Sequence, residues 1–133
     1  MPNQIMIVQY KDGRIHAHPK NSPDLISLWD QLDEIKSVVY ADVKGDIAAP
    51  TPIEETNLFV VMGDIPFNKF CKGLRIWSGY SQQRMAEIMG TNQTVISQFE
   101  RSKKLDANLM KDYLVALPFL TSNMIVKIIK AYT

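Results

Sequence analysis

The clearest apolar pattern in the chain is a pair of short helical stripes within residues 80–101. The first stripe contains Met85, Ala86, Ile88 and Met89, and the second contains Ile96 and Phe99. Gly90 lies between them, where a chain that leaves a helix often needs a positive φ angle. Ser81 and Asn92 precede the stripes and are residue types that cap helix N-termini. The pattern predicts two short helices joined by a tight turn.

Three further segments of the second half repeat their apolar residues at helical spacing. They span residues 67–79, 106–117 and 124–132. The positions expected to face the core are Phe70, Cys71, Leu74 and Trp77, then Leu109, Met110, Tyr113, Leu114 and Leu117, and finally Ile125, Ile128 and Ile129. Asp106 is expected to cap the second of these helices. The last stripe either completes the core of the monomer, which we favour, or forms a dimer seam.

The first half mixes strand and helix patterns. Two β-branched runs, residues 5–10 and 15–18, flank an Asp-Gly pair at Asp12, which is a strong hairpin signal. A helix is expected to begin at Ser22-Pro23-Asp24 and to run through Leu25, Leu28, Leu32 and Ile35. Residues 37–43 are expected to be a strand, or else a continuation of that helix. Residues 57–62 are expected to be a strand, with a loop at 44–52 before them.

These elements predict an α+β fold with two parts. Residues 1–66 form a small acidic α+β unit of ββαββ order, which serves dimerisation or partner binding. Residues 67–133 form an all-α unit of five helices, and the boundary is punctuated by Gly63-Asp64-Ile65-Pro66. Because so short a first unit buries little core, we expect it to pack against the second half or against another copy of itself.

The polar side of the helix at residues 92–101 carries the candidate chemistry. Gln93, Thr94, Ser97 and Gln98 lie away from its apolar stripe. A helix fits the major groove of B-DNA, where Gln pairs with adenine and the Thr methyl can contact thymine. These neutral side chains suit base reading, and the plainer interpretation is a solvated face rich in amides. Arg101, Lys103 and Lys104 follow and are placed to meet phosphates.

The segment resembles the lambda-repressor/Cro (XRE-type) helix-turn-helix family, over residues 67–118. The matching runs are Leu74-Arg75, Tyr80-Ser81-Gln82, Met85-Ala86-Glu87, the turn and helix from Gly90 to Ser97, and Phe99-Glu100-Arg101. The resemblance implies a lambda-repressor-like DNA-binding domain, and it implies that Gln82 contacts a phosphate. Ser102 stands where the family usually has Gly, and Leu105 where Pro is common. Residues 1–66 lie outside the resemblance.

Charge divides the chain in the same place. Residues 67–133 carry ten Lys and Arg against four acidic residues, which gives +6, and residues 1–66 carry five against ten, which gives −5. The sum is the net charge of +1. A basic half suits phosphate neutralisation, whereas an acidic half repels DNA and must face elsewhere.

Other classes of protein receive little support from the sequence. Cys71 is the single cysteine, so an internal disulfide and a CxxC zinc site are excluded. His16 and His18 share a strand face but have no third ligand nearby, and we expect no metal, cofactor or enzymatic activity. The apolar runs are too short for a membrane span, and the N-terminus lacks a signal-peptide pattern. A cytoplasmic protein is expected.

Together these features lead to two hypotheses of function. The first is a sequence-specific transcriptional regulator, a homodimeric repressor of the phage or plasmid type, which reads an inverted-repeat operator in double-stranded DNA with the helix 92–101. The second is an antitoxin-like protein. In that case residues 1–66 bind a protein partner and the helix-turn-helix part regulates its own operon.

Overall fold

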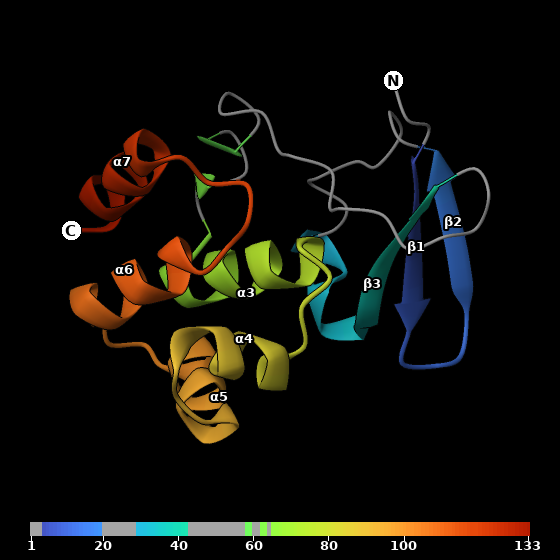
Figure 1. Ribbon diagram of the computed structural model, residues 1–133, viewed down its shortest axis with the longest axis horizontal. Coiled ribbons are helices and arrows are strands. Elements are labelled where there is room, and N and C mark those ends of the chain that lie inside the picture. Colours follow the sequence, from blue (N-terminus) through green and yellow to red (C-terminus); the bar gives the residue numbers. More distant parts are fainter. Residues whose placement is uncertain (1–3, 20–28, 43–57, 60–61, 64) are drawn as a thin grey trace.

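The computed structural model describes residues 4–19, 29–42, 58–59, 62–63 and 65–133. A three-stranded antiparallel sheet lies at one side of the molecule and the helices lie at the other (Figure 1). Within the described residues the sheet comes first along the chain and five α-helices follow it. The α+β prediction is therefore confirmed.

The sheet has the strand order β2-β1-β3 and is built around the predicted hairpin. β1 (Gln4–Tyr10) pairs with β2 (Ile15–Pro19) on one side and with β3 (Ile35–Asp42) on the other. Gly13 takes a φ of 94° in the turn, and Asp12 accepts a hydrogen bond of 3.0 Å from the amide of Arg14. The Asp-Gly signal therefore marks the turn that the chain uses.

The predicted helix from Ser22 to Ile35 is wrong at its C-terminal end. Trp29 and Asp30 are helical, but Leu32–Glu34 is a short 3₁₀ turn and Ile35 already begins β3. Ile35 pairs with Tyr10 across the sheet, so long-range strand pairing outweighs the helical spacing of the leucines. The start of this helix lies outside the described residues.

The strand predicted at residues 57–62 is also wrong where the structure describes it. Leu58, Phe59 and Met62 are helical, and Leu58 is fully buried in the core. A short apolar run suits a buried helical segment as well as a strand, so this pattern alone does not separate the two. The described strands therefore number three, and the loop predicted at 44–52 lies outside the described residues.

The helices of the second half begin close to the predicted positions. They are α3 (Phe67–Trp77), α4 (Gln82–Met89), α5 (Gln93–Arg101), α6 (Ala107–Val115) and α7 (Ser122–Tyr132). Asp106 caps α6, and the Thr121 hydroxyl caps α7 by accepting from the amide of Met124. Short polar side chains therefore fix these starts through local hydrogen bonds.

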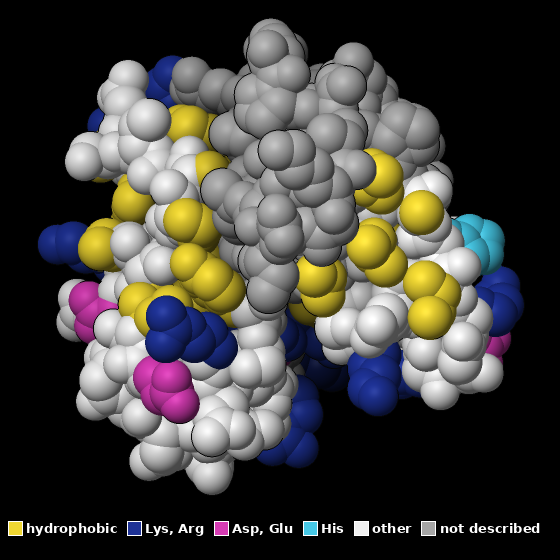
Figure 2. All heavy atoms as spheres, turned by 45° about the vertical axis from the view of Figure 1, so that its right-hand side comes forward, with side chains coloured by type: hydrophobic (Ala, Val, Ile, Leu, Met, Phe, Trp, Pro, Cys, Tyr) yellow, Lys and Arg dark blue, Asp and Glu magenta, His cyan; other side chains and the backbone are white. Residues whose placement is uncertain are grey.

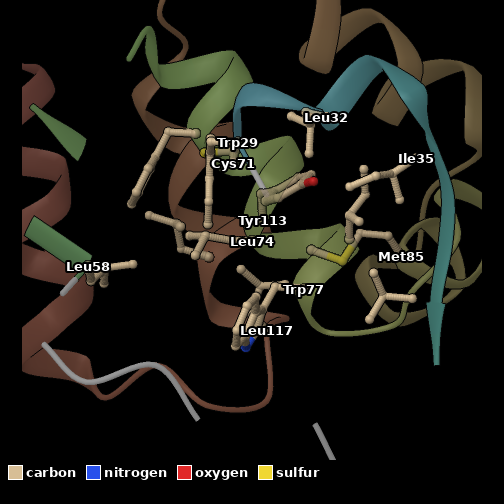
Figure 3. Packing of buried hydrophobic residues seen from close by; sticks show 14 of the residues in the cluster. Trp29, Leu32, Ile35, Leu58, Cys71, Leu74, Trp77, Met85, Tyr113 and Leu117 are labelled. Carbon is tan, nitrogen blue, oxygen red and sulfur yellow. The ribbon is translucent and has the colours of Figure 1, made fainter. Parts of the chain in front are cut away.

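The interior is one cluster of apolar residues drawn from both halves of the chain (Figure 3). Trp29 is stacked on Phe70 of α3, with ring centroids 6.1 Å apart. The hydroxyl of Tyr40 in β3 donates a 2.6 Å hydrogen bond to the carbonyl of Trp77. As expected, the sheet unit packs against the second half.

α7 completes this core. Met124 and Ile128 are buried, and Ile125 and Ile129 are half-buried against the cluster. Tyr132 reaches back to the segment before α3, where its hydroxyl donates a 2.7 Å hydrogen bond to the carbonyl of Ile65. No helix in the described ranges is long and apolar enough to cross a bilayer.

Candidate nucleic-acid interface

α4 and α5 form the pair of helices that the apolar stripes predicted. Ser81 caps α4 by accepting from the amide of Arg84 at 3.0 Å, and Asn92 caps α5 by accepting from Val95 at 3.1 Å. Gly90 ends α4 with a φ of 70°, a left-handed conformation that glycine adopts without strain. Local chemistry thus sets both ends of the turn.

The buried sides of the two helices face each other and the core. Met85 and Ala86 of α4 are buried, as are Ile96 and Phe99 of α5. Ile88 was expected in the apolar stripe, but it is 39% exposed. Its position is therefore on the solvent side of α4, and the contact with α5 rests on the other apolar residues.

The candidate base-reading residues lie on the outer side of α5. Gln93, Thr94 and Gln98 are exposed, and Ser97 is half-buried. Of the candidate phosphate-binding residues, Arg101, Lys103 and Lys104 are exposed at and just after the C-terminal end of α5, and Gln82 is half-buried at the start of α4. The structure thus brings all eight predicted side chains to α5, its two ends and the start of α4.

A buried ion pair anchors this surface from inside. Glu100, on the inner side of α5, accepts two hydrogen bonds from the guanidinium of Arg75, at 2.6 and 3.0 Å. Its carboxylate also accepts from the hydroxyl of Tyr113 at 2.7 Å and from Nε2 of Gln82 at 3.1 Å. One carboxylate therefore joins α3, α4, α5 and α6.

The electrostatics of this cluster keep Arg75 and Tyr113 in the protonation states that their hydrogen bonds to Glu100 require. Burial works to lower the pKa of Arg75, but the hydrogen bond to Glu100 and nearby charges outweigh burial and raise that pKa. Burial, reinforced by the charge of Glu100, raises the pKa of Tyr113 well above its ordinary value. Arg75 therefore stays charged and Tyr113 keeps the proton that it donates.

The cluster is connected to the outer surface through two amides. Gln82 donates to Glu100 with its Nε2, and its Oε1 accepts from Nε2 of Gln93 at 3.4 Å. The Gln82 amide is thus oriented by a buried carboxylate, and it holds Gln93 in turn. An oriented side chain loses less conformational entropy on binding than a free one.

The other end of α5 is shaped by contacts near its C-terminus. Arg101 donates from Nε to the carbonyl of Ser97 at 3.2 Å, so its side chain lies along the helix. Gln98 and Lys104 line one open hollow together with Val95 and Leu105. A candidate base-reading residue and a candidate phosphate-binding residue therefore share a continuous surface.

Ser102, at the position where the resemblance has glycine, ends α5 without backbone strain. Its φ of −72° and ψ of 142° are extended, so no left-handed residue is needed there. Its hydroxyl accepts from the amide of Lys104 at 3.1 Å. This hydrogen bond orders the turn that presents Lys103 and Lys104.

No protein-family model matches this chain. No curated protein and no solved structure matches it either. The interpretation of the surface around α5 therefore rests on its geometry and on the motif resemblance.

The sequence reasoning missed the buried cluster of Arg75, Glu100 and Tyr113. A signal was present, because Glu100 follows Phe99 and lies four residues after Ile96, on the inner side of α5. Arg75 likewise lies between two core residues of α3, Leu74 and Ile76. Opposite charges at two core-facing positions predict a buried pair, although the pattern alone does not show that they meet.

The histidine pair gains no support as a metal site. His16 is exposed and its ring makes an edge-on contact with Tyr10, with centroids 5.4 Å apart. Among the described residues, no group of three His, Cys, Asp or Glu side chains is placed to hold a metal ion. The side chain of His18 lies outside the described set.

Proposed function

We propose that this protein is a cytoplasmic, sequence-specific DNA-binding regulator that acts as a homodimeric repressor. The observation that carries the proposal is the outer side of α5, where neutral hydrogen-bonding side chains lie on a short helix that has exposed cations at its C-terminal end. The major groove of B-DNA is about 12 Å wide and admits an α-helix. Amides on such a helix can read bases, since their donors and acceptors match base edges.

The surrounding charges suit a phosphate backbone. Of the four acidic residues in the second half, Glu100 is buried against Arg75, and Glu87 lies within 3.4 Å of Arg84. Asp106 accepts the amide of Leu109 as a helix cap. The fourth, Asp112, is exposed on α6. The three cations Arg101, Lys103 and Lys104 at the C-terminal end of α5 outnumber the exposed carboxylate of Asp106 there, which favours binding to a polyanion.

A dimer follows from the geometry that such helices need. Two copies of α5, about one turn of DNA apart, would read an inverted repeat. Regulators of the resembled family often control their own promoters, which favours the DNA upstream of this gene as the first target. The overall test is a gel shift with that upstream DNA and with random DNA of equal length. Equal affinity for both would contradict sequence-specific binding.

Replacing Gln93 with alanine should weaken binding to the specific site by about 1–3 kcal/mol. The amide is held by Gln82 at 3.4 Å and is exposed for base contact. Binding to random DNA should hardly change, because phosphate contacts persist. Asn123→Ala, at an exposed amide on α7, is the matched control and should leave both affinities unchanged. An equal loss on both DNAs would remove Gln93 from the base-reading set.

Replacing Lys103 with alanine should weaken binding to every DNA sequence. One lost phosphate contact should lower the slope of log K against log salt by about 0.9. Titrations at several salt concentrations measure that slope directly. Lys130→Ala removes another exposed lysine, from α7, and should leave the slope unchanged. A slope that is unaltered in the Lys103 variant would place this lysine away from the backbone.

A further inference from the structure

The sheet makes a direct contact with the end of the helix that precedes α4 and α5. β3 is the strand nearest to the helices, and the C-terminal end of α3 meets it (Figure 1). Tyr40 of β3 is buried, and its hydroxyl donates a 2.6 Å hydrogen bond to the carbonyl of Trp77, the last residue of α3. Burial raises the pKa of Tyr40, so this hydroxyl keeps the proton that it donates. β3 therefore holds the chain at the point where it leaves α3.

The turn after α3 also lies close to the backbone of β3. Gly79 has a left-handed φ of 79°, and a Cβ added there would lie 3.0 Å from the carbonyl oxygen of Val38, closer than ordinary van der Waals contact. Any other residue at this position would be strained in its backbone and would press on the strand. Glycine thus allows the turn and β3 to approach each other at the position next to the Tyr40 hydrogen bond.

The same turn is connected by hydrogen bonds to the outer surface of α5. The carbonyl of Tyr80 accepts a 2.7 Å hydrogen bond from Nη1 of Arg75, whose Nε and Nη2 bind the carboxylate of Glu100. Glu100 orients the amide of Gln82, and Gln82 holds Gln93. α4 begins two residues after Tyr80. A displacement of the turn would therefore move both the start of α4 and one of the groups that fix the guanidinium.

We propose that Tyr40 is a positioning residue for DNA reading, and that β3 holds the turn between α3 and α4 so that the amides of Gln82 and Gln93 keep their orientation. α4 and α5 have only eight and nine residues. Helices so short are unstable on their own, so their direction depends on tertiary contacts. An orientation that is fixed before binding also costs less entropy when DNA arrives. The sheet thus contributes to specificity without contacting a base.

The junction of the sheet and the helices carries positive charge at its surface. Figure 2 shows Lys and Arg side chains gathered in the recess between the helical lobe and the sheet lobe. Positive charge there is compatible with a polyanion close by. The contact between β3 and the turn can therefore act while DNA is bound.

Tyr40→Phe tests the inference, because it removes the hydroxyl and keeps the buried ring. The affinity for the specific site should fall by about three- to tenfold, since a hydrogen bond of ordinary strength no longer orders the turn before binding. The affinity for random DNA should change by less than about twofold, because phosphate contacts do not depend on oriented amides. Gel shifts with both DNAs measure the two affinities and their ratio.

Tyr132→Phe is the matched control for this variant. The hydroxyl of Tyr132 donates a 2.7 Å hydrogen bond to the carbonyl of Ile65, just before α3 begins, so the control removes a bond of the same kind at the other end of that helix. Both variants should lower the melting temperature by a few degrees. Only Tyr40→Phe should lower the ratio of specific to random affinity. An equal fall of the ratio in both variants would reveal a general loss of stability and overturn the inference.

Gly79→Ala tests the same contact from the side of the turn. It adds a Cβ against the carbonyl of Val38 and should lower the specific affinity in the same way as Tyr40→Phe. Gly13→Ala is its control, because Gly13 also has a left-handed φ, of 94°, but a Cβ there meets no atom within 4 Å. This control should destabilise the chain without changing the ratio. If neither Tyr40→Phe nor Gly79→Ala changed the ratio, the inference would be wrong.

A measurement without DNA separates this inference from the proposed function, on which its role rests. In NMR spectra the side-chain amide signals of Gln82 and Gln93 should shift in Tyr40→Phe and Gly79→Ala, and they should stay in place in the two controls. Such shifts in a chain that binds no DNA would leave the positioning by β3 intact and refute the proposed function. Specific DNA binding, with unshifted amide signals and an unchanged ratio in Tyr40→Phe, would do the reverse.

Discussion

Replacing Glu100 with alanine should lower the free energy of unfolding by about 3–5 kcal/mol, the usual consequence of removing one partner of a buried ion pair. The side chains of Arg75 and Glu100 are only 8% and 2% exposed. Without the carboxylate, the guanidinium keeps its charge in a site that water hardly reaches. The hydroxyl of Tyr113 also loses its acceptor. Urea unfolding followed by tryptophan fluorescence measures the change.

An exposed ion pair provides the control for this prediction. Arg84 and Glu87 lie 3.4 Å apart on α4 with side chains that are 61% and 57% exposed. Glu87→Ala should change the stability by less than about 1 kcal/mol, because water screens the pair. The double variant Arg75→Met with Glu100→Leu should be more stable than Glu100→Ala, since no buried charge is left unpaired. A loss of under 1 kcal/mol in Glu100→Ala would contradict the buried cluster.

Glu100→Ala should also affect the surface of α5. Gln82 would lose the carboxylate that orients its amide, and Gln93 would lose its oriented neighbour. If α5 reads DNA, specific affinity should therefore fall at a temperature where the variant is still folded.

Replacing Gly73 with alanine should cost about 3 kcal/mol of stability, the upper range for overpacking a core. A Cβ added at Gly73 of α3 would overlap the indole ring of Trp29. That ring is 2% exposed and is stacked on Phe70, so a shift of the ring would disturb its packing in the core. Within the described part of the chain, the indole nitrogen of Trp29 has no hydrogen-bond partner, so close packing is what holds the ring. Thermal or urea unfolding measures the loss.

Replacing Trp29 with a smaller side chain tests whether its overlap with the added Cβ causes the loss of stability. In a Trp29→Leu background, Gly73→Ala should become neutral or stabilising by up to about 1 kcal/mol, because alanine is the better helix former. The two substitutions would then show strong coupling in a double-mutant cycle. Additive losses would mean that Trp29 and Gly73 are not in contact.

The elements that the sequence predicted well are those fixed by neighbouring residues. The hairpin turn at Gly13, the caps at Ser81, Asn92 and Asp106, and the left-handed Gly90 are all where the pattern places them. Each depends on hydrogen bonds within a few residues or on the φ angle of one residue. Such features can be predicted from the sequence because they do not depend on residues far away along the chain.

The outward face of α5 was predictable for a related reason. Helical periodicity assigns Ile96 and Phe99 to the core, and it leaves Gln93 and Gln98 outside regardless of what covers the apolar side. The same periodicity misplaced Ile88, which is partly exposed, because a helix of eight residues buries only a narrow stripe. How wide that stripe is depends on the neighbouring helices.

The sequence by itself determined the local geometry, namely where helices and turns begin and which side of α5 faces solvent. Tertiary structure alone decided that Ile35 joins a strand beside β1, that Leu58 is helical, that Trp29 lies over Gly73, and that Arg75 meets Glu100. The physical reason is sequence separation. Arg75 and Glu100 are 25 residues apart, and nothing in either neighbourhood specifies the other as a partner until the whole core has packed.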